Sequence, residues 1–165
     1  MWDSFVLAFA LTIAVADVFW RTIPRNLVVL GFFSGLAYHA FVGGLLSALA
    51  AAGLGFALGL GFYELRAIGG GDVKLITALG AMLGFAHWLV ALEVAITVAG
   101  LWALAGVIRR GVLLQTFRNM GRLLKHFFTH GLRPHPDIQV NNTSLVRIPF
   151  GVAAALGTLS TFIIK

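Results

Sequence analysis

The chain has 165 residues, of which 59% are hydrophobic and 11% are charged, and it contains no cysteine. Soluble globular domains carry about 25% charged residues, so this composition excludes an ordinary soluble protein and predicts a membrane protein of one domain. The lack of cysteine excludes disulfides, cysteine-zinc sites and thiol catalysis. The formal charge of +6 is gathered between apolar runs, which indicates a lipid surface and not nucleic acid as the partner.

Six apolar runs predict an all-α polytopic membrane protein, with about six transmembrane helices forming a single domain over residues 1–165. The runs lie at about 4–20, 27–43, 45–63, 72–86, 88–108 and 145–164. Gly43-Gly44 and the segment 85–87 are expected to form tight turns between neighbouring helices.

Of the twelve Lys and Arg residues, all but Lys165 lie in three connections: after the first run, around the fourth run's start, and between 109 and 147. The positive-inside rule therefore places these connections in the cytoplasm and both termini outside.

Residues 109–144 form the one long polar region and are expected to be a cytoplasmic linker. Its apolar residues recur at helical spacing, at Leu113, Leu114, Phe117, Met120, Leu124 and Phe127. A separate basic stripe comprises Arg118, Arg122 and Lys125. This pattern predicts a basic amphipathic helix on the anionic inner leaflet; docking of a substrate or partner is the alternative interpretation.

Two aspartates occupy comparable positions in the apolar runs. Asp17 lies near the end of the first run, and Asp72 follows three glycines at the start of the fourth. A charged side chain within the bilayer costs about 2.5–3.5 kcal/mol on insertion scales, so such residues are usually functional. The glycines permit positive φ and leave no Cβ, so backbone, a partner helix or substrate can come close.

The two acids are predicted to lie at matching depth. At about 1.5 Å per residue, each is roughly 20 Å below the outer surface and in the cytoplasmic third of a core of about 30 Å. Two carboxyl groups that share a site can act as acid and base on one water molecule. The alternatives are structural: Asp17 pairs with Arg21 on its own helix, and Asp72 caps the fourth helix.

Three motifs resemble those of a known family. Gly69-Gly70-Gly71-Asp72 fits the Gly-x-Gly-Asp signature of intramembrane aspartyl proteases, and the following Val73-Lys74-Leu75 narrows the resemblance to type IV prepilin peptidases. The first catalytic motif of that family is matched by Asp17, Arg21, Ile23, Pro24 and Asn26, with Arg25 as a small departure. Ile148-Pro149-Phe150-Gly151 resembles the family's Pro-Phe-Gly element.

The resemblance implies an aspartic endopeptidase that cuts the short basic leader from prepilin precursors at the cytoplasmic face of the bacterial inner membrane. Asp17 and Asp72 would be catalytic, and no metal or cofactor is implied. The supporting residues would be Gly69, Gly70, Gly71, Lys74, Pro149, Phe150 and Gly151. The chain is similar to the short form that processes Flp-type pilins in tight-adherence systems. N-methylation of the new terminus is not expected, because the cysteine-containing domain of the larger members is missing.

Glu64, near the end of the third run, is a candidate contact for the basic leader, with a solvated or arginine-paired acid as the plainer interpretation. Two other functions stay open on residues alone. One is a small transporter or channel whose paired acids bind protons or cations. The other is a non-catalytic scaffold of a secretion machine.

Overall fold

The computed structural model describes residues 1–64, 68–114, 116, 118, 121–122, 129 and 150–163, and this part of the chain contains helices and no strands. The helices are α1 (Trp2–Trp20), α2 (Arg25–Val42), α3 (Leu45–Glu64), α4 (Gly70–Arg109) and α6 (Phe150–Ile163). Four of them, α1 to α4, are long and apolar enough to cross a membrane. The all-α membrane fold agrees with the prediction, whereas the number of six spans stays a prediction.

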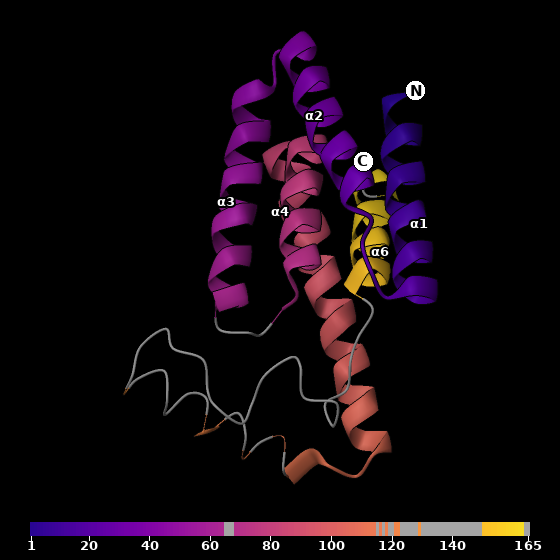
Figure 1. Cartoon of the computed structure of the whole chain (residues 1–165), viewed down its shortest axis with the longest axis vertical. Coiled ribbons are helices and arrows are strands. Elements are labelled where there is room, and N and C mark those ends of the chain that lie inside the picture. Colours follow the sequence, from indigo (N-terminus) through magenta and orange to yellow (C-terminus); the bar gives the residue numbers. More distant parts are fainter. Residues whose placement is uncertain are drawn as a thin grey trace.

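Helix α4 folds back on itself at Gly84. The backbone leaves helical geometry there, with φ at 71° and ψ at 171°, a region that only glycine enters without strain. The indole Nε1 of Trp88 donates to the Ile76 carbonyl at 3.1 Å. A straight helix would hold residues twelve apart at a separation of about 18 Å, so the limbs 70–83 and 85–109 run side by side (Figure 1).

Side chains from α1, α2 and α3 satisfy the backbone groups that this fold-back releases. The Met82 carbonyl accepts hydrogen bonds from Trp2 Nε1 at 3.2 Å and from His39 Nε2 at 3.3 Å. The Phe85 N–H donates to the Ser47 hydroxyl at 2.8 Å. Unpaired backbone groups are costly in lipid, so these contacts fix where the helix turns. The turn was expected at 85–87 and lies at Gly84.

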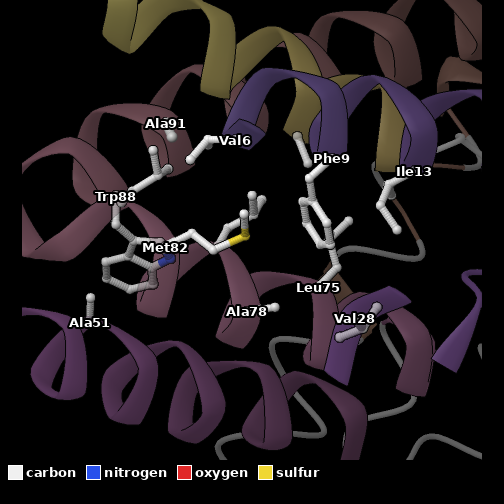
Figure 2. Packing of buried hydrophobic residues seen from close by; sticks show 13 residues of the cluster. Val6, Phe9, Ile13, Val28, Ala51, Leu75, Ala78, Met82, Trp88 and Ala91 are labelled. Carbon is white, nitrogen blue, oxygen red and sulfur yellow. The ribbon is translucent and has the colours of Figure 1, made fainter. Parts of the chain in front are cut away.

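Helix α4 is the centre of the bundle, since it packs against α2, α3 and α6, and α6 in turn packs against α1. Trp88, Ile13, Leu75 and Met82 are among the largest fully buried side chains. Figure 2 shows Phe9 and Ile13 of α1 directed toward Leu75 of α4. This core holds the fold-back of α4 against the N-terminal helix.

The bundle has two distinct ends. Helix α1 starts and α6 ends at one of them, whereas the end of α1 and the starts of α4 and α6 gather at the other (Figure 1). Of the predicted basic amphipathic helix, Leu113, Leu114, Arg118 and Arg122 are described and helical. The rest of that helix and most of the linker 109–144 lie outside the described residues, as do 65–67 and 145–149. Those expectations therefore stay predictions.

Candidate functional site

Asp72 is anchored within its own helix start. Gly69 precedes the first turn of α4 in an extended conformation, with φ at −81° and ψ at 153°. Asp72 Oδ2 accepts a hydrogen bond from the Gly69 N–H at 3.1 Å, as the third residue of a capping box does. Asp72 is half-buried. The capping interpretation of Asp72 is thus seen in the structure, and it leaves the second carboxyl oxygen without a hydrogen bond within the described part of the chain.

The three glycines before Asp72 do not use the positive φ that glycine permits. Positive φ among the described glycines occurs at Gly43, Gly84 and Gly111. Gly70 and Gly71 already belong to α4, and helical φ is negative. A Cβ on Gly71 would lie 3.5 Å from the Ile23 side chain, which is ordinary van der Waals contact. The α1–α2 connection therefore rests on the start of α4.

Asp17 is anchored across the molecule. It lies three residues before the end of α1 and is half-buried. Its Oδ2 accepts a hydrogen bond of 2.7 Å from the Gly151 N–H at the start of α6. The predicted alternative, an ion pair with Arg21, is not found among the described contacts; Arg21 instead ends α1 with φ at 51° and ψ at 28°.

The folded chain brings the two acids to the same end of the bundle. Ile23, which follows the helix of Asp17, lies beside Gly71, the residue before Asp72: a Cβ on Gly71 would be 3.5 Å from its side chain. No hydrogen bond joins the two carboxyl groups within the described residues. Both lie at the end of the bundle where α1 finishes and where α4 and α6 begin (Figure 1). Sequence motifs that are 55 residues apart, at Asp17 and Asp72, thus meet at one place.

The other residues predicted for the site differ in their exposure and in whether the structure describes them. Phe150 packs against the hydrophobic core at the start of α6, while Pro149 lies outside the described residues. Glu64 is the exposed last residue of α3, and Lys74 is exposed on α4. No group of three His, Asp or Glu side chains that could hold a metal ion occurs in the described part of the chain.

Sequence reasoning missed the contact between Gly151 and Asp17. Gly151 was expected to be a supporting residue of the site, but nothing in the spacing of its motif indicated a hydrogen bond to Asp17, 134 residues away. The Phe85–Ser47 bond that secures the fold-back was missed for the same reason, since hydrophobic periodicity reports helices and not their polar cross-links.

The fold and the site define a polytopic membrane protein, helical over the residues that the structure describes, with two acids at one end of its bundle. Residues 4–104 match the model of the type IV leader peptidase family. This match spans more than half of the chain and includes Asp17 and Asp72, so the chain belongs to the type IV leader peptidase family. Searches of curated proteins and of solved structures found no match for the chain.

Proposed function

We propose that this protein is an intramembrane aspartyl endopeptidase that removes the short basic leader of type IV pilin-like precursors at the cytoplasmic face of the bacterial inner membrane. The observation that carries the proposal is the placement of Asp17 and Asp72 at one end of the bundle, on different helices, in a chain of the leader peptidase family. The family match does not favour the transporter or scaffold alternatives.

The proposed reaction uses the two carboxyl groups as an acid and a base. The ionised carboxylate takes a proton from water while the water oxygen attacks the scissile carbonyl carbon, and the protonated carboxyl gives its proton to the carbonyl oxygen. The tetrahedral intermediate then collapses as the C–N bond breaks, and the leaving amine receives a proton from the dyad. The protons belong to the pair, so neither role is assigned to one residue.

Replacement of each acid by its amide tests this proposal. Asp17→Asn and Asp72→Asn should each lower the cleavage rate of a purified pilin-like precursor by at least about 100-fold, because either half of the acid–base pair would be lost. Each has a control on its own helix: Asp3→Asn on α1 and Glu93→Gln on α4. Cleavage that survives in either test variant removes that acid from the dyad. Equal losses in the controls would mean that the amides act through folding.

The leader-binding role of Glu64 is part of the same proposal. The exposed carboxylate ends α3, five residues before Gly69, and it would attract a basic leader by charge. Glu64→Gln in the same assay is expected to raise the KM for the precursor a few-fold with kcat unchanged, since a solvent-exposed ion pair contributes about 0.2–1 kcal/mol. An unchanged KM leaves Glu64 as a solvated acid.

A further inference from the structure

We infer that Gly151 is a positioning residue for Asp17: its backbone N–H, presented by α6, fixes one carboxyl oxygen and leaves the other to react. The inference rests on the proposed function for its catalytic meaning. The hydrogen bond itself can be tested without any substrate.

The contact is close in two respects. The donor–acceptor distance from the Gly151 N–H to Asp17 Oδ2 is 2.7 Å, the range of charge-assisted hydrogen bonds. In addition, a Cβ at position 151 would lie 2.8 Å from Asp17 Cβ and 2.9 Å from Oδ2. Real Cβ atoms do not approach this closely, so any other residue here displaces the Asp17 side chain. Position 151 therefore provides a backbone N–H donor and cannot hold a side chain without displacing that of Asp17.

The start of α6 provides this donor for a structural reason. The first N–H groups of a helix have no intrahelical acceptor, and the N-terminus carries partial positive charge. Gly151 is buried, and the Asp17 oxygen is the acceptor of its N–H within the described part of the chain. The Asp17 carboxylate thus accepts a hydrogen bond from a free N–H of the α6 start, and the partial positive charge there stabilises the carboxylate.

The rest of α6 fixes where this donor lies. A Cβ on Gly157 would overlap the Ala91 carbonyl of the second α4 limb, so the two backbones are in direct contact there. Phe150 packs its ring into the core beside Gly151. The amide that holds Asp17 is therefore placed by α4, the same helix that carries Asp72.

The two acids share one pattern of anchoring. In each, Oδ2 accepts a hydrogen bond from a backbone N–H, that of Gly151 for Asp17 and that of Gly69 for Asp72. In each, Oδ1 has no hydrogen-bond partner among the described residues. These two oxygens are the ones available to a water molecule and a scissile carbonyl, so the amides select which half of each carboxyl reacts.

Enzyme kinetics test the positioning role. Gly151→Ala should lower kcat for precursor cleavage by about 10–100-fold, because displacements of the order of 1 Å at a reacting group cost this much. The KM should stay within about twofold, since binding of the precursor's helix and leader is untouched. The matched control is Gly53→Ala on α3, where an added Cβ meets no atom within 4 Å. A kcat equal to that of the control overturns the positioning role.

A spectroscopic measurement tests the hydrogen bond independently of activity and of whether Gly151→Ala folds. Phe150-Gly151 is the one Phe-Gly pair in the sequence, so carbonyl-¹³C phenylalanine with ¹⁵N glycine selects a single amide signal in detergent micelles. That proton should resonate downfield in the wild type and in Asp17→Asn, and move upfield in Asp17→Ala. An unchanged signal in Asp17→Ala overturns the inference. If the wild type cleaves no precursor, the proposed function fails while this measurement still decides the contact.

Discussion

The two acids are held over very different lengths of chain. Asp72 accepts its hydrogen bond from Gly69, three residues away, whereas Asp17 accepts its own from Gly151, 134 residues away. The first contact exists as soon as the start of α4 is helical. The second exists only after α6 has packed against α1 and α4. The hydrogen bond of Asp72 therefore needs only local helix formation, whereas that of Asp17 needs the whole bundle to be assembled.

The family match covers both acids but only one of the two backbone N–H groups that bind them. It runs over residues 4–104 and so takes in both acids and both limbs of α4 up to residue 104. Helix α6, which supplies the donor to Asp17, lies beyond it. The acids are thus recognisable from the matched region, while the group that orients one of them is visible only in three dimensions.

The largest expected effect comes from separating α6 from α4. Gly157→Leu would force a side chain into the Ala91 backbone, and overpacking of this kind costs about 1–3 kcal/mol or more. Unfolding in a detergent titration should show this loss, and precursor cleavage should fall with it, because Gly151 would no longer reach Asp17.

The matched control for that variant is Gly100→Leu. Gly100 lies on the second limb of α4, and a Cβ there meets no atom within 4 Å. The added leucine should face lipid and leave both stability and cleavage close to those of the wild type. A Gly157→Leu protein as stable as this control would contradict the close packing of α6 on α4.

A smaller effect should separate the two anchors in stability. Asp17→Ala leaves the buried Gly151 N–H without an acceptor, which costs about 1–3 kcal/mol. Asp72→Ala removes the acceptor that the Gly69 N–H has in the capping box, and a single intramolecular hydrogen bond contributes about 1 kcal/mol net. The free energy of unfolding, measured for both in the same detergent, should therefore fall further for Asp17→Ala.

The asparagine variants at the same two positions are the controls for the two alanine variants. Asn keeps a carbonyl oxygen that can accept the same N–H, so Asp17→Asn and Asp72→Asn should retain more stability than the alanine variants. If Asp72→Ala is the less stable of the two alanine variants, the long-range anchor is not the stronger one.

The sequence predicted the helices better than their connections. The first three apolar runs were expected at about 4–20, 27–43 and 45–63, and α1, α2 and α3 lie at Trp2–Trp20, Arg25–Val42 and Leu45–Glu64. Bilayer thickness and hydrophobicity suffice for such segments. The fold-back of α4 could not be placed as well, because it depends on Trp2, His39 and Ser47, which reach it from three other helices.

The number of spans shows a related limit. The limb 70–83 has 14 residues, as has the described extent of helix α6 (Phe150–Ile163), and 14 residues span about 21 Å at 1.5 Å per residue. That is shorter than a hydrocarbon core of about 30 Å. Runs of apolar letters do not show where a helix begins within them, so the predicted six full spans remain to be tested.

For the site, the sequence predicts the hydrogen bond of Asp72 but not that of Asp17. The cap at Asp72 follows from residues next to it in the chain, and reading Gly69 to Asp72 as a helix start predicts it. The bond at Asp17 requires the relative placement of α1 and α6, which no local pattern contains. Sequence reasoning therefore identified both acids but explained the position of only one.

The smallest effect is expected from a substitution at Gly70, which has room for a Cβ where Gly151 has none. A Cβ on Gly70 would lie 3.5 Å from the Tyr63 ring, which is ordinary contact, whereas one on Gly151 would overlap Asp17. Alanine is preferred over glycine in helices by about 0.5–1 kcal/mol, with less gain expected in a first turn. Gly70→Ala should therefore unfold at the same detergent concentration or slightly higher, and cleave the precursor within about twofold of the wild-type rate. A loss of cleavage in a fully stable Gly70→Ala protein would show that the precursor backbone passes over this glycine. The space around Asp72 would then serve substrate, as the space around Asp17 serves α6.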